Sequence, residues 1–366
     1  MSLNCGIVGL PNVGKSTLFN ALTSTQIAQA ANYPFCTIEP NKGIVDVTDS
    51  RLQQISNISK SKALLPAKLE FVDIAGLVKG ASKGEGLGNQ FLANIKEVDA
   101  IIHVLRCFDD GNVIHVEDSV NPKRDADIVN TELMLADLES LEKRIPNLEK
   151  KAKGGDKEIK EQLAVMLKIL PHLQKGEPAR KAVLTVEEQL VANQLFLMTI
   201  KPVLFVCNVG ENDLMGENAY VQQVKELASQ ENAEYVIICS KLEQEISALE
   251  SVSEKQEFLE SMGMQETGLD KIIKSAFKLL GLHTFFTSGP QETRAWTIPV
   301  GAKAPQAAGT IHSDFEKGFI CAETISCADY IALGGEAKAK EMGKVRQEGK
   351  QYVVQDGDII LFRFNV

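Results

Sequence analysis

The chain of 366 residues is long enough to bury two or three hydrophobic cores, because domains usually contain about 50 to 250 residues. Its formal net charge of −10 at pH 7 excludes a global basic field for nucleic acid, so an RNA contact has to come from a local patch. No apolar run approaches the roughly 20 residues that cross a bilayer, and no basic region precedes the first apolar stretch, which excludes a membrane partner and predicts a cytoplasmic protein.

A glycine-rich stretch stands near the amino terminus. Residues 9–17 have the sequence GLPNVGKST, which matches the GxxxxGKS pattern. An apolar run of strand length precedes it at residues 3–8, and a segment with helical spacing follows at residues 17–22. A phosphate-binding loop requires this order of strand, loop and helix, whereas a glycine-rich turn that carries GKS by chance does not. We therefore predict a nucleoside triphosphate site here.

The residue types of this loop suit a triphosphate. Gly9 and Gly14 leave room for the backbone to wrap a phosphate, and the N–H groups and dipole of the following helix add positive potential. Lys15 supplies a mobile cation for the phosphates, and the Ser16 hydroxyl is a ligand for Mg²⁺. The predicted nucleotide-binding residues of the loop are Asn12, Val13, Gly14, Lys15, Ser16 and Thr17.

Two segments further along the chain have the character of nucleotide switches. Thr37 follows the lysine by about twenty residues and is a candidate to close over the γ-phosphate and bind Mg²⁺, with an ordinary loop threonine as the alternative. Residues 68–73 form an apolar strand that ends in Asp73, which can hold Mg²⁺ through water. The N–H of Gly76 completes a DxxG arrangement and can meet the γ-phosphate.

The next position carries Leu77, whose side chain has no donor or acceptor and cannot align an attacking water. Hydrolysis therefore has to be slow or to use a polar group from elsewhere. His115, in the polar segment at residues 109–116, is a candidate to reach the γ-phosphate, and a solvated or packing histidine is an equal alternative. The predicted catalytic residues are Lys15, Gly76 and His115.

The base is expected at the carboxyl end of a later strand, residues 202–207. Guanine-binding proteins carry NKxD there, but this chain has Asn208-Val209-Gly210-Glu211, without the lysine and with an acid one methylene longer. An aspartate in NKxD accepts from guanine, whereas the amide of Asn208 can bond N6 and N7 of adenine. The pattern favours ATP over GTP. The predicted base-binding residues are Asn208, Val209, Glu211 and Ser240.

The segment between the switch strands and the base strand has a different periodicity. Apolar residues recur at spacings of 4, 3, 4 and 3 in two arms around a turn at residues 153–156. This heptad pattern predicts an antiparallel helical hairpin that can reach a partner, and Pro146 and Pro171 should kink each arm or end it early. The stripe comprises Met134, Leu138, Leu141, Ile145 and Leu148, then Ile159, Leu163, Met166, Leu170 and Leu173.

The composition changes again from residue 283 onward. Strand-like segments at residues 293–300 and 352–362 predict a separate small α+β domain. The second segment is expected to form two strand arms around an Asp356-Gly357 turn.

In several of these motifs the chain resembles the YchF family, which comprises Obg-like ATPases in the translation-factor class of P-loop GTPases. The resemblance rests on GLPNVGKST, YPFCTIEPN, DIAGLVKGASKGEGLGNQF, NVGE in place of NKxD, and LHTFFTSGPQETRAWTIPVG near the carboxyl end. It covers essentially the whole chain.

This resemblance implies an α/β P-loop NTPase fold with a doubly wound, mostly parallel sheet, an inserted coiled-coil hairpin and a carboxyl-terminal α+β domain of the β-grasp-like TGS type. The expected domains are the nucleotide-binding domain at 1–129 and 201–282, the coiled coil at 130–200 and the TGS domain at 283–366. The family's loop histidine matches His115, and Asn12 matches an asparagine that accompanies activation by K⁺ in related enzymes.

The expected function is a ribosome-associated switch that binds ATP and hydrolyses it to ADP and phosphate, slowly without a partner. Mg²⁺ would be held by Ser16, Thr37 and Asp73. Two alternatives stay open. One is a GTP-hydrolysing factor that acts in translation, and the other is an ATP-liganded adaptor whose turnover is incidental.

Overall fold

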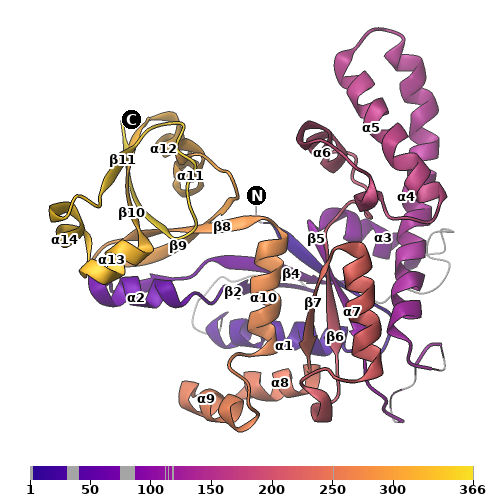
Figure 1. Cartoon of the computed structure of the whole chain (residues 1–366), viewed down its shortest axis with the longest axis horizontal. Helices are drawn as coiled ribbons and strands as arrows, with labels where there is room; N and C mark the ends of the chain where they lie inside the picture. Colours follow the sequence, from indigo (N-terminus) through magenta and orange to yellow (C-terminus); the bar gives the residue numbers. More distant parts are fainter. Residues whose placement is uncertain are drawn as a thin grey trace. The chain divides into compact units, whose positions relative to one another are not determined.

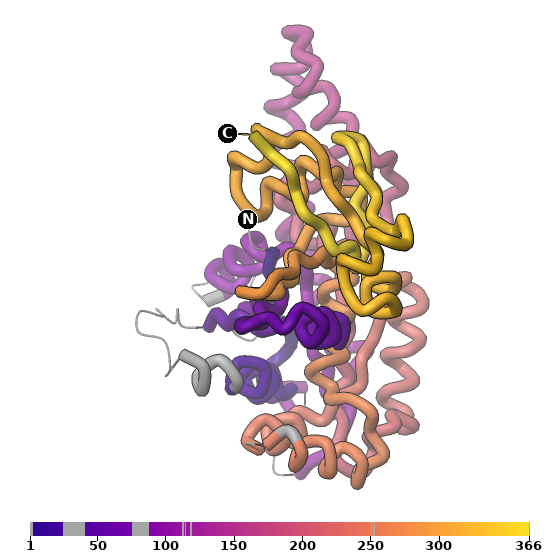
Figure 2. Tube along the Cα trace, turned by 90° about the vertical axis from the view of Figure 1, so that its left-hand side faces the viewer, coloured from indigo at the N-terminus to yellow at the C-terminus, as the bar shows by residue number. Residues whose placement is uncertain are grey.

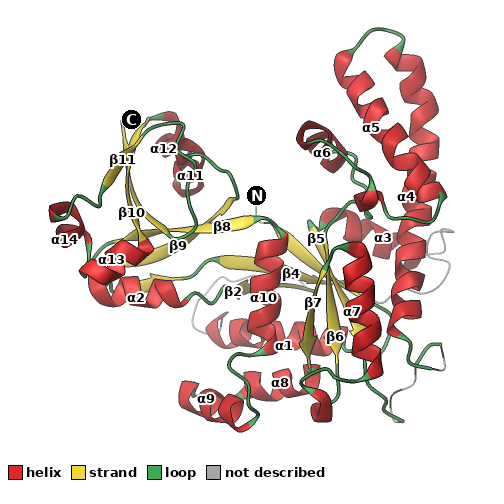
Figure 3. Cartoon of the chain, in the orientation of Figure 1, coloured by secondary structure: helices red, strands yellow, loops and turns green. Residues whose placement is uncertain are grey.

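The computed structural model describes residues 3–30, 41–74, 87–111, 113, 115–117, 119–249 and 251–365. The chain forms two compact units, one of Met1–Ile44 with Glu70–Ala276 and the other of Val45–Leu69 with Phe277–Val366. Each unit is built on a six-stranded sheet (Figures 1 and 3). Among the described residues, no helix is long and apolar enough to cross a bilayer.

The first unit contains a mostly parallel sheet with helices on its faces. Its strands, in spatial order, are β2 (Lys42–Asp46), β4 (Lys68–Asp73), β1 (Asn4–Val8), β5 (Ala100–Arg106), β6 (Val203–Asn208) and β7 (Glu234–Ile238). β1 pairs in parallel with β4 and β5, and β6 pairs in parallel with β5 and β7. Every residue of β5 and β6 is buried, as expected for central strands of a sheet that is covered on both faces.

The described part of this unit contains nine helices of eight or more residues, and the last of them, α10, ends three residues after the unit does. They are α1 (Lys15–Ala30), α3 (Leu87–Glu97), α4 (Pro122–Ala152), α5 (Lys157–Gln174), α6 (Val186–Asn193), α7 (Ala219–Glu231), α8 (Ser240–Ala248), α9 (Val252–Ser261) and α10 (Gly268–Leu279). α1 packs with α8, and α4 packs with α7. The predicted doubly wound, mostly parallel P-loop fold is confirmed.

Parallel strands bring their carboxyl ends to one edge of a sheet, and this places the predicted site residues together. β1 ends directly before the 9–17 loop, and β4 ends in Asp73. β5 runs into the segment that carries His115, and β6 ends in Asn208. Residues that are far apart in the sequence therefore meet at a single edge.

The predicted helical hairpin is present as α4 and α5, which lie side by side and extend beyond the sheet (Figures 1 and 2). The turn at residues 153–156 ends in Asp156, whose carboxylate accepts the Glu158 N–H at 2.9 Å and caps α5. Every residue of the predicted apolar stripe except Ile159 lies in the hairpin core or packs against it.

The burial of α5 differs from a two-helix coiled coil. Val165 and Ile169 are fully buried although they lie outside the predicted stripe, while Leu163 and Leu170 are only partly buried. The reason is that α6 also packs on α5, so the apolar face of α5 has to serve two neighbours.

Pro146 does not end α4 early, because the helix continues to Ala152. The kink, which was the other expected effect of this proline, stays a prediction. A proline removes the hydrogen bond to the carbonyl four residues earlier, here that of Glu142. Glu142 is on the exposed side of α4, where water can take the place of the lost donor. Pro171 lies in the last turn of α5, which ends at Gln174.

The root of the hairpin is held by buried polar contacts. The Asp137 carboxylate, 1% exposed, accepts the N–H groups of Met198 and Thr199 at 2.9 and 2.7 Å and the Thr199 hydroxyl at 2.7 Å. Burial raises the pKa of Asp137, and these hydrogen bonds oppose that rise. Arg180 forms an ion pair with Glu231 at the end of α7. The base of the hairpin is therefore attached both to the loop that contains Met198 and Thr199 and to α7.

The second unit is an α+β structure, as predicted. Its sheet has the order β11-β10-β12-β8-β9-β3, in which β8 with β9 and β10 with β11 and β12 are antiparallel, while β12 with β8 and β3 with β9 are parallel. The strands are β3 (Ala63–Leu65), β8 (Leu282–Ser288), β9 (Glu292–Pro299), β10 (Phe319–Ser326), β11 (Arg346–Glu348) and β12 (Asp358–Phe364). The helices are α2 (Ser50–Ser59), α11 (Ala304–Ile311), α12 (Ser313–Lys317), α13 (Cys327–Leu333) and α14 (Glu336–Glu341).

Two features of this unit differ from the sequence-based expectation. Residues 45–69 were expected in the nucleotide-binding domain, but β3 pairs with β9 and Arg51 reaches Asp356 at 2.7 Å, so the segment groups with the second unit. The strand arms expected around Asp356-Gly357 do not pair with each other. Instead the Asp356 carboxylate accepts the Thr284 N–H of β8 at 2.9 Å, and only the arm after Gly357 becomes a strand, β12.

Replacing Asp137 with Ala should destabilise the first unit by about 3 kcal/mol or more, because two N–H groups and one hydroxyl would lose their acceptor in a buried site. The free energy of unfolding is measured by urea denaturation followed by circular dichroism. Glu142→Ala, on the exposed side of the same helix, is the control and should stay within about 0.5 kcal/mol of the native chain. Equal stability of the two variants would contradict the anchoring role.

Candidate functional site

The 9–17 loop follows β1 in a conformation that depends on its glycines. Gly14 has a φ of +98°, and a Cβ there would lie 2.3 Å from Nδ2 of Asn208. A Cβ on Gly9 would lie 2.5 Å from the carbonyl oxygen of Val104 in β5. Both positions therefore require glycine, because the obstacle is main chain at Gly9 and, at Gly14, a side-chain amide that two hydrogen bonds hold in place. α1 begins at Lys15, so the first N–H groups of this helix face the loop.

Lys15 is held inside the loop in this structure. Its Nζ donates to the carbonyl oxygen of Leu10 at 2.7 Å, and the residue is 7% exposed. Burial lowers the pKa of Lys15 to about 8, although the nearby Asp73 carboxylate acts in the opposite direction. The ammonium is thus poorly solvated, and an anion that entered the loop would stabilise its charged form.

The structure brings together two of the predicted metal ligands. Ser16 Oγ donates to Asp73 Oδ2 at 3.2 Å, across the edge between α1 and β4. The second oxygen of Asp73, Oδ1, is buried and has no hydrogen-bond partner within the described ranges. Burial raises the pKa of Asp73, and the Ser16 hydrogen bond and Lys15 oppose the rise. An unpaired carboxylate oxygen beside a hydroxyl fits a hard divalent cation such as Mg²⁺.

The base end of the site is organised by the side-chain amide of Asn208. Its Nδ2 donates to the Val13 carbonyl at 2.9 Å, and its Oδ1 accepts the Ser240 N–H at 2.9 Å. Asn208 is buried, and each polar atom keeps one further hydrogen-bonding position. The Ser240 hydroxyl is buried as well, and it has no partner in the part of the chain that the structure describes.

The other two predicted base-binding residues, Val209 and Glu211, have side chains that are buried or paired with another residue. Val209 is 2% exposed, and its N–H donates to the Ile238 carbonyl at 2.8 Å. The Glu211 carboxylate forms an ion pair with Lys241 at 2.6 Å, and both side chains are exposed. This acid is therefore already occupied by a cation, unlike an acid that is held ready for guanine.

One aromatic residue beside the base loop was missed by the sequence-based reasoning. Phe108 follows β5 and is half-buried, and its Cβ would lie 3.7 Å from a Cβ built on Gly210. A lone aromatic residue belongs to no motif. Its position directly after the strand between the phosphate-loop strand and the base strand was the one available signal.

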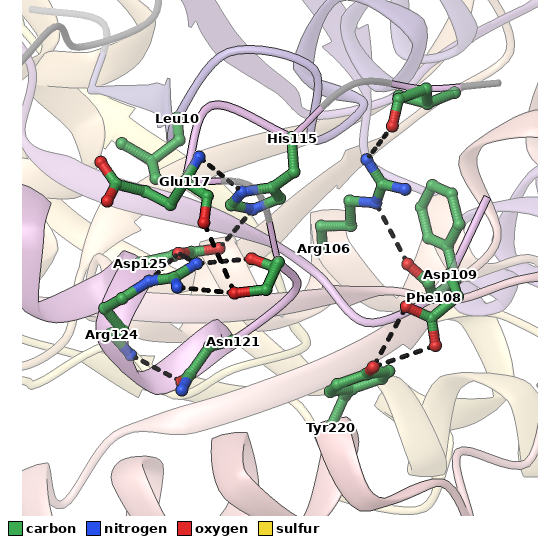
Figure 4. Close-up of polar contacts among 12 residues, drawn as sticks. Leu10, Arg106, Phe108, Asp109, His115, Glu117, Asn121, Arg124, Asp125 and Tyr220 are labelled. Atoms are coloured by element: carbon green, nitrogen blue, oxygen red, sulfur yellow. Dashed lines mark hydrogen bonds and ion pairs between the residues drawn. The ribbon is translucent and has the colours of Figure 1, made fainter. Parts of the chain in front are cut away.

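His115 is buried in a polar cluster with the first turn of α4 (Figure 4). Its Nδ1 accepts the Glu117 N–H at 3.0 Å, so Nε2 carries the proton that is donated to Asp125 Oδ2 at 2.8 Å. Arg124 holds the other oxygen of Asp125 at 2.9 Å. Both ring nitrogens are therefore engaged, and a role in catalysis requires this pair to open.

Thr37, Gly76 and Leu77 lie outside the described residues. The structure thus brings together Lys15, Ser16, Asp73, Asn208 and Ser240 at the edge of the sheet, and it holds His115 in its own pair with Asp125. Within the described ranges, no group of three His, Cys, Asp or Glu side chains could hold a metal ion, so a cation here would rely on the Ser16 and Asp73 oxygens and on water.

A phosphate loop between β1 and α1, an acid at the end of β4 and a base loop after β6 define the class of P-loop nucleotide-binding proteins. Residues 4–135 match the family model described as 50S ribosome-binding GTPase. Residues 282–365 match the YchF-GTPase_C model, which is described as a protein of unknown function (DUF933).

The chain belongs to the YchF family. The Ribosome-binding ATPase YchF of Escherichia coli O157:H7 is 55% identical over 366 residues, and that of Bacillus subtilis (strain 168) is 54% identical over 368 residues, with 100% of both chains covered in each case. The solved structure of the Schizosaccharomyces pombe YchF GTPase matches with a TM-score of 0.88 at 38% identity, covering 99% of this chain and 98% of that one. The family resemblance expected from the motifs is confirmed.

The buried ammonium of Lys15 should titrate near pH 8 in the free protein. Asp73→Asn should lower this pKa further, because the carboxylate charge favours the protonated amine. The measurement is a pH titration by NMR with labelled lysine, in which Lys15→Arg assigns the signal. Lys241, whose pKa is raised by Glu211, is the internal control. A Lys15 pKa that rises in Asp73→Asn would contradict the geometry.

Proposed function

We propose that this chain is a ribosome-associated nucleotide switch that binds ATP and hydrolyses it to ADP and phosphate. The observation that carries the proposal is the meeting of Lys15, the Ser16–Asp73 pair and the Asn208 bridge at the carboxyl edge of one parallel sheet. The relatives that are named ribosome-binding ATPases support it, since they match over their full length.

The phosphates would lie over the first turn of α1. The N–H groups of Val13, Gly14, Lys15, Ser16 and Thr17 would surround them, and the helix dipole would add to the attraction. Lys15 would leave the Leu10 carbonyl for the β- and γ-phosphates, which is favourable because an anion restores the charge stabilisation that burial has removed.

Mg²⁺ would be held by Ser16 and, through water, by Asp73, with Thr37 as the further predicted ligand. The unpaired Oδ1 of Asp73 supports this assignment. When bound, the ion neutralises charge on the β- and γ-phosphate oxygens.

K⁺ is the second proposed cation, on the basis of Asn12 in the phosphate loop. Replacing K⁺ with Na⁺ in a turnover assay tests whether K⁺ is required.

Hydrolysis would proceed by in-line attack of water, with positioning and charge neutralisation as the main contributions. Lys15 and the N–H of Gly76 would stabilise the γ-phosphate. His115 would act only after its pair with Asp125 opens, because Nδ1 and Nε2 are both occupied in this structure. Slow turnover of the isolated chain follows from this arrangement and from Leu77.

The base loop supports ATP over GTP. Guanine recognition by NKxD needs a lysine stem over the ring and a free aspartate, but here Val209 is buried and Glu211 is paired with Lys241. Asn208 keeps one N–H and one lone pair, and Ser240 keeps its hydroxyl, which suits the donor and acceptor of the adenine N6 and N7 edge. A GTP-hydrolysing factor is the second candidate, favoured by the Schizosaccharomyces pombe relative, which is described as a YchF GTPase.

The domain roles are part of the proposal. Residues 1–44, 70–129 and 201–276 would be the nucleotide-binding domain and residues 130–200 the coiled coil that reaches a partner. Residues 283–366 would be the TGS domain, with residues 45–69 grouped in its unit. The ribosome is the proposed partner of the whole chain.

Changing Val209 to Lys together with Glu211 to Asp should raise the affinity for GTP relative to ATP, because it restores the residue types of a guanine-reading loop. Competition binding with the two nucleotides measures the ratio. A ratio that stays at the native value would place base recognition elsewhere.

Replacing Lys15 with Ala should weaken ATP binding by about a hundredfold, because a charge-assisted contact to the phosphates is lost. Isothermal titration calorimetry measures the affinity, and Lys143→Ala, an exposed lysine of the hairpin, is the matched control.

In co-sedimentation, native protein should associate with ribosomes differently in its apo, ATP and ADP forms, and Lys15→Ala should lose this difference.

Native affinity in Lys15→Ala would refute the phosphate role of this residue. Identical sedimentation of the three native forms would instead argue against a switch and favour the adaptor.

A further inference from the structure

Arg106 is the last residue of β5 and is only 2% exposed. Its guanidinium donates three hydrogen bonds to main-chain carbonyls of the segment that follows the strand, and Figure 4 draws the one to Phe108. Nε donates to Phe108 at 3.1 Å, Nη2 to Asp110 at 3.1 Å, and Nη1 to Val113 at 2.9 Å. One buried side chain therefore sets the path of this segment.

The same guanidinium also covers an aromatic ring. Cζ of Arg106 lies 4.7 Å from the centroid of the Phe108 ring, within the range of a cation–π contact. Phe108 is half-buried, so the guanidinium shields one side of the ring while part of the ring stays accessible.

The segment is fixed against the base loop and against the first turn of α7. The Cys107 N–H donates to the Asn208 carbonyl at 2.8 Å, and the Cys107 carbonyl accepts from Asn218 Nδ2 at 2.8 Å. Tyr220 donates to Asp109 at 2.9 Å. Arg106 is itself the register partner of Asn208 on β6. Phe108 is thus held beside Gly210, in the loop that borders the proposed base.

We propose that Arg106 is a positioning residue for the nucleotide base, which acts by holding the Phe108 ring ready to stack on the purine. This inference rests on the proposed function and adds a determinant of affinity to it. A planar guanidinium presents its donors in a fixed fork and can serve three carbonyls at once, whereas a lysine ammonium presents them from one point. A ring fixed before binding loses less rotational freedom when the base arrives, and this raises the affinity.

A positioning role predicts a specific pattern of binding loss. Stacking involves the base alone, so a disordered Phe108 should weaken ATP but leave inorganic tripolyphosphate unaffected. A residue that only stabilised the fold would weaken both ligands together. The ratio of the two affinities therefore separates the two roles.

The test measures ATP and tripolyphosphate affinities by calorimetry for the native chain, Arg106→Lys, Phe108→Leu and the double variant. Arg106→Lys should lower the ATP-to-tripolyphosphate affinity ratio by about tenfold, and Phe108→Leu should do the same. The double variant should lose no more than Phe108→Leu alone, because Arg106 acts through the ring. Arg144→Lys, which alters an arginine–carbonyl contact in the hairpin, is the matched control and should leave the ratio unchanged.

An unchanged ratio in Arg106→Lys, or equal losses for both ligands, would overturn the positioning role. Should Arg106→Lys fail to fold in a thermal melt, Phe108→Leu carries the test, and an unchanged ratio there would overturn it equally. If the native chain binds neither ATP nor tripolyphosphate, the proposed function fails, and this outcome is distinct from failure of the inference.

Discussion

The interaction on which the site depends is the bridge made by the Asn208 amide. Its Nδ2 donates to the Val13 carbonyl of the phosphate loop, and its Oδ1 accepts the Ser240 N–H at the start of α8. Three loops from different strands are thereby fixed by one buried side chain, and Gly14 is needed because the amide lies where its Cβ would be. Buried polar groups must be paired, so losing this amide would leave two backbone groups without partners.

The fold makes this bridge possible by aligning strand ends. β5 and β6 are buried along their whole length, and their carboxyl ends deliver Arg106 and Asn208 as register partners. Polar side chains at this edge are therefore fixed by the packing of the apolar strands behind them. The site combines rigid parts, such as Asn208, with parts held in contacts that a ligand can replace, such as Lys15 on the Leu10 carbonyl and Ser16 on Asp73.

Local patterns in the sequence predicted much of this molecule. Glycine spacing predicted the β1–loop–α1 order, and heptad spacing predicted the hairpin, because both signals lie within a few turns of chain. The failures are non-local. Nothing near Ala63–Leu65 signals that this strand pairs with β9, and nothing near His115 or Arg106 signals their engagement with Asp125 or with three carbonyls. Such contacts depend on where distant backbone lies after folding.

The most direct measurement is a crystal structure of the protein with magnesium and a non-hydrolysable ATP analogue. The account predicts phosphates on the N–H groups of residues 13–17, a magnesium ion beside Ser16 and Asp73, and the adenine next to Asn208 and Ser240. A nucleotide bound away from the first turn of α1, or a purine turned away from the Asn208 loop, would contradict it.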